Sequence, residues 1–262
     1  MVSAANIQCY SFDAVVFDVD GVLTNTAVIH AASWKAMFDE YLHLRESRDG
    51  ETFREFTYEK DYLPYVDGKP RYKGVQSFLE SRGIAVGFGD PKDKPGKETV
   101  CGLGNRKNAT FIKVLKEKGV EVYQSSVDLI KDLKAKGIRI GAASSSKNCQ
   151  YILQTADIID LFETCIDGVV SAELGLKGKP EGDIFVKAAE NIGAHPSRAV
   201  VVEDAVSGVQ AGINGGFGLV IGVARENNAN ELKSNGANVV VADFEGITTD
   251  MIEQWFTQGH NQ

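Results

Sequence analysis

Short apolar runs alternate with amphipathic segments through the second half of this chain, and this alternation constrains the fold more than any other feature. The expected strands cover residues 138–143, 199–202, 218–223 and 239–241. The expected helices cover residues 127–136, 147–156, 180–192 and 205–214. Such alternation is typical of parallel strands with helices on both faces of the sheet. The sequence therefore predicts an α/β fold with a doubly wound, Rossmann-like parallel sheet.

A further strand is expected near the N-terminus, and it is separated from the others by a long helical segment. Residues 13–19 form a β-branched and aromatic run that stops at Asp20-Gly21. From Trp34 to Leu42 the apolar residues recur at spacings of three and four, as on one helix face. Residues 71–83 and 107–119 are amphipathic and stop at glycine. We expect residues 1–24 and 121–262 to form the core and residues 25–120 to form an inserted helical cap.

Composition limits the classes of partner. With a net charge of −8, the chain lacks the positive charge that binding to nucleic acid or to an anionic membrane requires, although a local basic pocket for one small anion remains possible. The four cysteines, at positions 9, 101, 149 and 165, form no Cys-x-x-Cys pair and read as reduced thiols. No signal peptide or membrane-length apolar run is evident, so a cytoplasmic protein is expected. No obligate protein partner is evident.

Acidic pairs follow two of the expected strands. Asp18 and Asp20 follow the first strand, and Glu203 and Asp204 follow the strand at 199–202. Ligand sites of open parallel sheets lie at the carboxyl ends of strands. Two bare carboxylates about 5 Å apart repel by about 3 kcal/mol at an effective dielectric constant of 20, so a cation is expected among them, and hard oxygen ligands suit Mg²⁺. Alternatively, Asp-x-Asp-Gly is turn chemistry and the second pair caps a helix.

Two further segments have residue types that bind phosphate. Ser144, Ser145 and Ser146 follow the strand at 138–143 and precede a helix, and helix N-termini hold phosphate through backbone amides. Lys179 precedes Pro180 at the expected start of another helix, where a cation opposes the helix dipole. Alternatively, the serines cap the helix and the lysine is solvated.

Taken in order, these motifs resemble those of the haloacid dehalogenase superfamily over nearly the whole chain. The resemblance implies a nucleophile at Asp18, a general acid/base at Asp20, phosphate contacts from Ser144 and Lys179, and an Mg²⁺ ion. It implies metal ligands from Asp18, the backbone carbonyl of Asp20, Glu203 and Asp204. Members that transfer phosphoryl groups keep an acid at the position of Asp20, whereas dehalogenases usually lack it.

Several segments resemble the β-phosphoglucomutase branch more closely. They are residues 20–30, Trp34, residues 105–108, residues 144–148 and residues 179–185. This resemblance implies a cap hinge at Thr26. It implies substrate contacts from His30, Lys107, Ser145 and Asn148, although His30 could equally be a helix-surface residue.

The branch's cap motif Gly-Val-Ser-Arg reads Gly74-Val75-Gln76-Ser77 here, so its phosphate-binding arginine is missing. Arg71 or Lys73 is the candidate replacement. The pattern Arg71-Tyr-Lys-Gly-Val and the long cap also resemble mutase-like proteins found beside or fused to disaccharide phosphorylases, which implies a sugar phosphate substrate.

We therefore predict Mg²⁺-dependent phosphoryl transfer through an aspartyl phosphate on Asp18. Because the site carries four carboxylates, the approach of a phosphate is easier if Asp20 is protonated, as donation to the leaving oxygen also requires. Hydrolysis of a small phosphorylated sugar is favoured by the missing cap arginine. The alternatives are a β-phosphoglucomutase, which interconverts β-glucose 1-phosphate and glucose 6-phosphate, and a non-catalytic phosphosugar-binding module.

Overall fold

A computed structural model describes residues 9–225 and 227–259. Contacts divide the chain into two compact units: one comprises Met1–Leu23 and Val122–Gln262, and the other comprises Thr24–Glu121. The roles of these units as catalytic core and cap stay a prediction. Within the described ranges, no helix is both long and apolar enough to cross a membrane.

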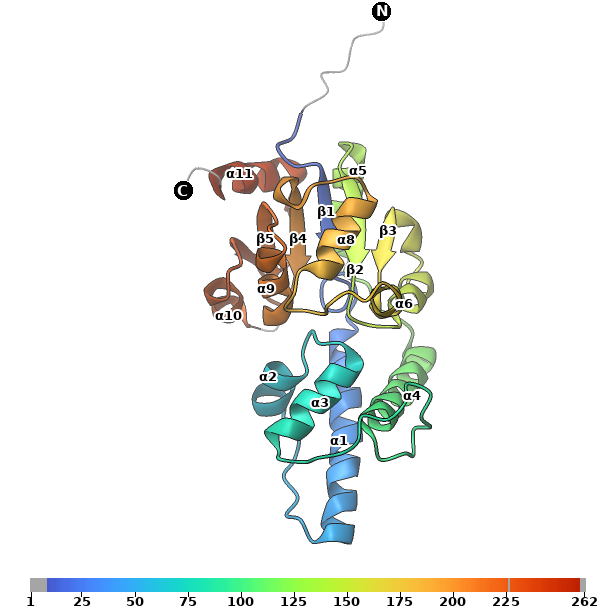
Figure 1. Cartoon of the computed structure of the whole chain (residues 1–262). Coiled ribbons are helices and arrows are strands. Elements are labelled where there is room, and N and C mark those ends of the chain that lie inside the picture. Colours follow the sequence, from blue (N-terminus) through green and yellow to red (C-terminus); the bar gives the residue numbers. More distant parts are fainter. Residues whose placement is uncertain (1–8, 226, 260–262) are drawn as a thin grey trace, which may run out of the picture. The chain divides into compact units, whose positions relative to one another are not determined.

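The first unit is built on a six-stranded parallel sheet of order β3-β2-β1-β4-β5-β6 (Figure 1). Its strands are β1 (Ala14–Phe17), β2 (Arg139–Ala143), β3 (Thr164–Ile166), β4 (Ala199–Glu203), β5 (Leu219–Val223) and β6 (Val239–Val241). Phe17 lies opposite Ala142 of β2 and Val202 of β4, so these strands end at the same edge. Strand β3 was not expected: it is as short as β6, but it reads Thr-Cys-Ile, whereas β6 is a run of three valines.

Helices cover both faces of this sheet, as the alternating pattern predicts. They are α5 (Gln124–Ala135), α6 (Cys149–Thr155), α7 (Gly168–Glu173), α8 (Asp183–Asn191), α9 (Val206–Asn214), α10 (Ala229–Ser234) and α11 (Thr249–Gly259), with short helical turns at Ile159–Leu161 and Pro196–Arg198. Residues of α8, α9 and α10 share one apolar core with Val16 and Val201. Helices α5 and α11 contact each other and strands β2 and β5, respectively. The doubly wound α/β fold is therefore confirmed.

The helix expected at 180–192 begins later than predicted. It starts at Asp183, because residues 178–181 form a turn in which the Glu181 amide donates to the Gly178 carbonyl at 3.1 Å. Lys179 is therefore four residues away from the helix, and the idea that it opposes its own helix dipole is wrong. Its position is explained by its long-range partners, described below.

The second unit is helical. Its helices are α1 (Ala27–Asp49), α2 (Leu63–Tyr65), α3 (Arg71–Ser81) and α4 (Val100–Lys118), and a π-helical turn at Tyr58–Tyr62 precedes α2. Aromatic side chains dominate its core, where the Phe38 ring lies 4.0 Å from Phe78 and 5.0 Å from Phe56 between centroids. Helix α4 starts earlier than the predicted residue 107, because the Thr99 hydroxyl caps it by accepting from the Gly102 amide at 3.0 Å.

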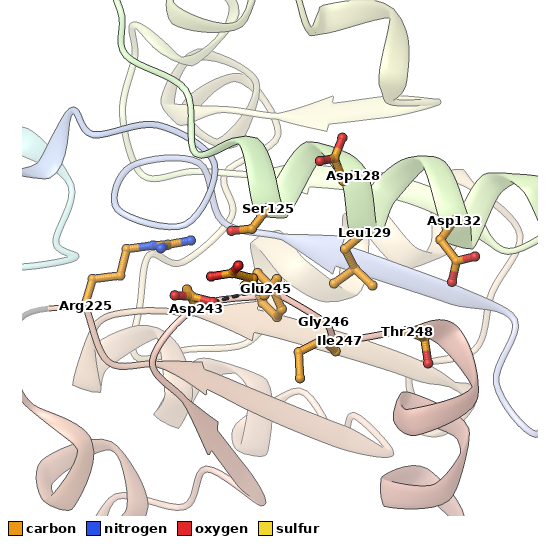
Figure 2. A pocket seen from close by; sticks show the side chains of 11 residues that line it. Ser125, Asp128, Leu129, Asp132, Arg225, Asp243, Glu245, Gly246, Ile247 and Thr248 are labelled. Atoms are coloured by element: carbon orange, nitrogen blue, oxygen red, sulfur yellow. Dashed lines mark hydrogen bonds between the residues drawn. The ribbon is translucent and has the colours of Figure 1, made fainter.

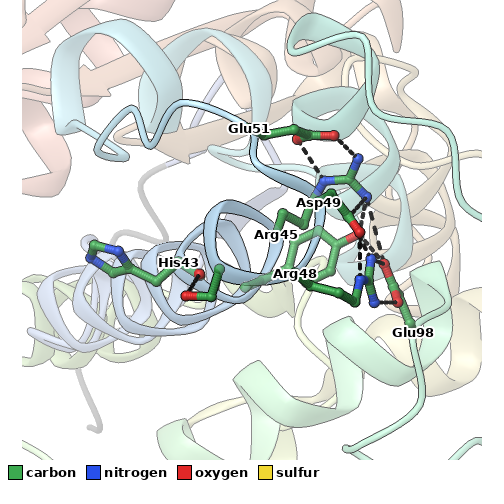
Figure 3. A network of polar contacts seen from close by, with 8 residues as sticks. His43, Arg45, Arg48, Asp49, Glu51 and Glu98 are labelled. Atoms are coloured by element: carbon green, nitrogen blue, oxygen red, sulfur yellow. Dashed lines mark hydrogen bonds and ion pairs between the residues drawn. The ribbon is translucent and has the colours of Figure 1, made fainter.

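A network of ion pairs lies at the C-terminal end of α1 (Figure 3). Arg48 contacts Glu98 at 2.6 Å, and the Tyr41 hydroxyl donates to the same carboxylate at 2.8 Å. Arg45 pairs with Glu51 and lies 3.6 Å from Glu98. Burial and the hydrogen bond to Glu98 raise the pKa of Tyr41 to about 12. The network thus joins α1 to the segment that precedes α4.

Candidate active site

Three carboxylates meet at the carboxyl edge of β1 and β4. Asp18 directly follows β1, and Glu203 and Asp204 lie at the end of β4. Because the two strands pair in register, the Asp18 amide donates to the Val202 carbonyl at 2.9 Å. One carboxylate oxygen from each of Asp18, Glu203 and Asp204 lies within 4.8 Å of the others. Two segments that are 185 residues apart in the sequence therefore form one cluster of hard oxygen atoms that could hold a metal ion.

A buried lysine bridges two of these carboxylates. The Lys179 Nζ atom donates to the Asp18 Oδ1 atom at 2.5 Å and also contacts Glu203 Oε1. Its side chain is 2% exposed, so a solvated surface lysine is ruled out at this position. Burial opposes the charge on Lys179, but Asp18 and Glu203 outweigh it and raise the lysine pKa. The amine therefore stays protonated and supplies positive charge to the cluster.

The pKa of Asp18 lies far above that of an exposed aspartate. Burial raises it to about 8, and the charges of Glu203 and Asp20 add to this effect, whereas Lys179 opposes it. The single lysine thus balances only part of the negative charge. An added cation at this point would favour the ionised carboxylate again, so the donor set fits a hard divalent ion.

Two glycines make room for the acidic side chains. A Cβ atom on Gly208, in the first turn of α9, would lie 1.8 Å from Glu203 Oε1. A Cβ atom on Gly21 would lie 1.8 Å from Asp204 Oδ2, and Gly21 has a φ of +87°, which other residues rarely adopt. Glu203 Oε2 also accepts from the Ala205 amide at 2.6 Å. Glu203 therefore accepts hydrogen bonds both from the backbone just before α9 and from Lys179.

The serine segment contacts the second aspartate. The Ser144 hydroxyl lies 3.2 Å from Asp20 Oδ2 and accepts from the Ser146 amide at 3.0 Å. Helix α6 begins only at Cys149, with Asn148 in the N-cap position, so the interpretation of Ser144 as a helix cap is wrong. Ser145 and Asn148 lie in the same loop and are partly buried. The structure therefore brings together Asp18, Asp20, Ser144, Lys179, Glu203 and Asp204.

The remaining predicted residues lie in the second unit. The Lys107 Nζ atom, on α4, lies 2.5 Å from His30 Nδ1 on α1, so the surface interpretation of His30 does not hold. Lys107 is 3% exposed and sits 4.7 Å from the Phe111 ring centroid. Thr26, in the N-cap position of α1, is buried, and its hydroxyl lies 2.7 Å from that of Thr24.

The two candidate replacements for the missing arginine differ in environment. Arg71, at the start of α3, is partly buried, and burial lowers its pKa. Its guanidinium donates to the neutral amide oxygen of Asn108 at 2.7 Å. Lys73 is exposed. Ser77, where the arginine of the motif would stand, accepts from Lys69 Nζ at 2.9 Å.

Three residues that were not predicted from the sequence contact the Asp18–Leu23 turn or Asp204. Arg225 donates to the Gly21 carbonyl, Ser126 donates to the Val22 carbonyl, and Asn228 donates to the Asp204 carbonyl. No periodicity or motif marks them, because each acts through a backbone atom that is distant in the sequence.

A doubly wound parallel sheet that gathers carboxylates and a buried lysine at the end of its central strands defines an α/β enzyme. Comparison with known proteins gives the class its name. A family model for haloacid dehalogenase-like hydrolases matches residues 12–216. The chain belongs to the haloacid dehalogenase-like hydrolase family.

Individual relatives cover most of the chain. This chain is 45% identical over 234 residues to a β-phosphoglucomutase of Mycobacterium bovis, and the match covers 88% of this chain and 89% of that protein. It is 37% identical over 236 residues to an uncharacterized glycosyl hydrolase of Mycobacterium tuberculosis, covering 90% of this chain but only 17% of that protein. A solved β-phosphoglucomutase structure from Clostridium difficile matches with a TM-score of 0.74 and 22% identity, over 96% of this chain and 100% of the other. Because the sequence identity is 22%, this structural similarity is evidence for the fold only.

Proposed function

We propose that this protein is an Mg²⁺-dependent phosphoryl-transfer enzyme that acts on a small sugar phosphate, with Asp18 as the nucleophile. The observation that carries the proposal is the position of the Asp18 carboxylate, which lies within 4.8 Å of Glu203 and Asp204 and is held by Lys179. The names of the relatives, which include a β-phosphoglucomutase and a much longer glycosyl hydrolase, support a sugar as the carrier of the phosphate. The net charge of −8 supports a small molecule rather than a nucleic acid.

The metal would be held by the carboxylates of Asp18, Glu203 and Asp204 and by the backbone carbonyl of Asp20. Oxygen donors of this kind suit Mg²⁺, which also keeps part of its water shell and binds phosphate oxygens. When bound, the ion would offset the negative charge that the four carboxylates and a phosphate bring together.

In the proposed reaction, an Asp18 oxygen attacks phosphorus, and the bond between phosphorus and the sugar oxygen breaks. The product is an aspartyl phosphate, and one difficult displacement becomes two easier ones. Asp20 donates a proton to the departing sugar oxygen and takes one from the acceptor in the second step. The Ser144 hydroxyl, 3.2 Å from Asp20 Oδ2, helps to orient that carboxyl. Lys179 and Ser144 stabilise charge on the phosphoryl oxygens.

The second unit and the serine loop would supply the remaining contacts. We assign substrate binding to His30, Arg71, Lys73, Lys107, Ser145 and Asn148, and hinge motion to Thr26. Because Lys107 donates to His30 Nδ1, the imidazole keeps a fixed orientation with its other nitrogen directed away from the lysine. Of the two candidate replacements for the missing arginine, Arg71 is favoured, because it is partly buried and its hydrogen-bond partner is a neutral amide. A neutral partner competes less than a carboxylate would with an incoming anion for the guanidinium.

Water is the proposed acceptor of the phosphoryl group, which makes the enzyme a phosphatase. The basis is Ser77, which replaces the arginine of the branch's cap motif. The second candidate is a mutase, in which a sugar hydroxyl is the acceptor. It is favoured by the half-buried guanidinium of Arg71, which could hold a second phosphate, and by the 45% identity to a β-phosphoglucomutase.

One pair of assays distinguishes these functions. Purified protein with Mg²⁺ is given a panel of sugar phosphates, and released inorganic phosphate is measured. In parallel, β-glucose 1-phosphate is supplied and glucose 6-phosphate is measured. Phosphate release supports the phosphatase, isomerisation supports the mutase, and activity in neither assay supports the binding module.

Two substitutions test the assigned roles. Asp18→Asn is expected to abolish both activities, and Asp20→Asn is expected to stop turnover while Mg²⁺ binding survives. Unchanged turnover in either variant would refute its role.

A further inference from the structure

The Asp18–Leu23 turn connects the proposed nucleophile to the second unit, and hydrogen bonds from residues distant in the sequence hold its backbone. Three successive carbonyls in this turn each accept a hydrogen bond from a distant residue. Arg225 Nε donates to Gly21 at 3.2 Å, the Ser126 hydroxyl donates to Val22 at 2.7 Å, and the Tyr123 amide donates to Leu23 at 2.9 Å. We refer to Arg225, Ser126 and Tyr123 as the turn brace.

Arg225 links the other members of the brace. Its Nη2 atom lies 3.2 Å from the Ser126 hydroxyl, and its guanidinium carbon lies 3.7 Å from the centroid of the Tyr123 ring. A planar guanidinium can stack on a ring and donate in two directions at once, whereas a lysine amine cannot do both. The contacts of Arg225 are therefore specific to arginine.

The position of the turn decides where one metal-ligand candidate can lie. The carboxylate of Asp204 packs against Gly21, because a Cβ atom added to Gly21 would lie only 1.8 Å from Asp204 Oδ2. Displacement of Gly21 toward Asp204 would push this carboxylate out of the cluster, and displacement away would leave it unsupported. Asn228, three residues after Arg225, also donates to the Asp204 backbone carbonyl at 2.9 Å. One short segment after β5 thus holds both the turn and the residue packed on it.

The charge of Arg225 also acts on this region. Burial lowers its pKa, but Tyr123, Asp243 and Asp204 oppose the change, and a guanidinium stays protonated in proteins. Figure 2 shows Arg225 at one end of a cavity of about 430 Å³, whose lining includes Asp128, Asp243 and Glu245. The positive charge of Arg225 therefore interacts both with Asp243, in the lining of this cavity, and with Asp204.

We propose that Arg225 is a positioning residue that holds the Asp18–Leu23 turn, through Gly21 and Ser126, in the arrangement that the metal-binding carboxylates require. The proposal rests on the proposed function, since it assumes that Asp18 and Asp204 bind Mg²⁺. A residue with only a structural role would lower the stability of the fold without changing the metal affinity of the folded protein.

The test measures Mg²⁺ binding directly by isothermal titration calorimetry, on full-length Arg225→Lys and Ser126→Ala. Arg225→Lys keeps the charge but loses the stacked, two-direction contact, and we expect its Kd for Mg²⁺ to rise about 10- to 100-fold, as is typical when a residue supporting a metal ligand is replaced. Ser126→Ala is expected to raise the Kd by a smaller factor. Hydrogen exchange is expected to speed up at the Leu23 amide, which donates to the Val19 carbonyl at 3.0 Å.

A matched control is Arg139→Lys. Arg139 also donates to a backbone carbonyl, that of Ile192, but it lies at the amino end of β2, on the opposite edge of the sheet. We expect its Kd for Mg²⁺ to remain within about twofold of the unsubstituted protein, even if its melting temperature falls.

The outcomes separate the two proposals. If Arg225→Lys binds Mg²⁺ as tightly as Arg139→Lys, Arg225 is not a positioning residue, whatever the enzyme activity. If the unsubstituted protein binds no Mg²⁺, both the proposed function and the role of Arg225 are wrong. If the protein binds Mg²⁺ and only Arg225→Lys and Ser126→Ala weaken binding, the role of Arg225 holds even where no sugar phosphate is hydrolysed.

Discussion

Gly208→Ala is predicted to damage the protein although it places a better helix former in α9. Alanine stabilises a helix by up to about 1 kcal/mol relative to glycine. The added Cβ atom, however, would lie 1.8 Å from Glu203 Oε1 and 2.0 Å from its Cδ atom, whereas non-bonded heavy atoms pack at about 3.5 Å. The Glu203 side chain must therefore move by more than about 1 Å, since the clashing atoms belong to its carboxylate.

This movement removes two hydrogen bonds to a charged group. Glu203 accepts from the Ala205 amide at 2.6 Å and from Lys179. Hydrogen bonds to charged groups contribute about 1.5–3 kcal/mol each. After the helix gain of up to about 1 kcal/mol is subtracted, the free energy of unfolding is expected to fall by about 2–5 kcal/mol.

Urea denaturation followed by circular dichroism measures this change, and calorimetry measures Mg²⁺ binding by the same samples. Gly74→Ala in α3 is the matched control, because the nearest heavy atom to its added Cβ is 3.3 Å away, and we expect stability within about 1 kcal/mol of the unsubstituted protein. Glu203→Asp in the Gly208→Ala background shortens the acidic side chain and should recover part of the loss. A Gly208→Ala protein as stable as Gly74→Ala, with unchanged Mg²⁺ binding, would contradict the packing argument.

Three further predictions concern charged groups. Lys179→Met removes the cation beside Asp18, so the pKa of Asp18 should rise above about 8 in the metal-free protein, and turnover at pH 7 should fall at least about 100-fold in a phosphate-release assay. Asp61→Asn should lower the free energy of unfolding by about 2–4 kcal/mol in urea denaturation at pH 7, because the buried Asp61 pairs with the partly buried Arg82 at 2.8 Å. Burial raises the pKa of Asp61, but the Thr57 amide and the arginine outweigh it and lower the pKa overall, so this difference should vanish as the pH falls from about 4 through the lowered pKa. Glu98→Gln should bring the pKa of Tyr41 down from about 12, measured by ultraviolet titration, while stability changes by less than about 1 kcal/mol.

The residues that bear local patterns were predictable. The strand ahead of Asp18 and the strand ahead of Glu203 are short, apolar and followed by acidic residues, and parallel pairing brings such strand ends to one edge. Lys179 and Ser144 were also identified: Lys179 because a cation before an expected helix opposes the helix dipole, and Ser144 because hydroxyls ahead of a helix can bind phosphate, with a helix cap as the alternative. Lys179 is held by Asp18 and Glu203 rather than placed at a helix start, and Ser144 contacts Asp20 rather than capping α6.

The amino-acid sequence by itself determined the α/β class, the strands that carry the acidic residues and the family, because each depends on periodicity or on motifs within a few residues of one another. Only the tertiary structure decided which groups touch. Arg225 and Ser126 reach the Asp18–Leu23 turn through backbone carbonyls, and any residue type offers such a carbonyl, so no pattern in the sequence records the contact. Glu203 and Gly208 illustrate the same limit. The Glu203 carboxylate occupies the space that a Cβ atom at position 208 would need, so the requirement for glycine there is visible only in the folded structure.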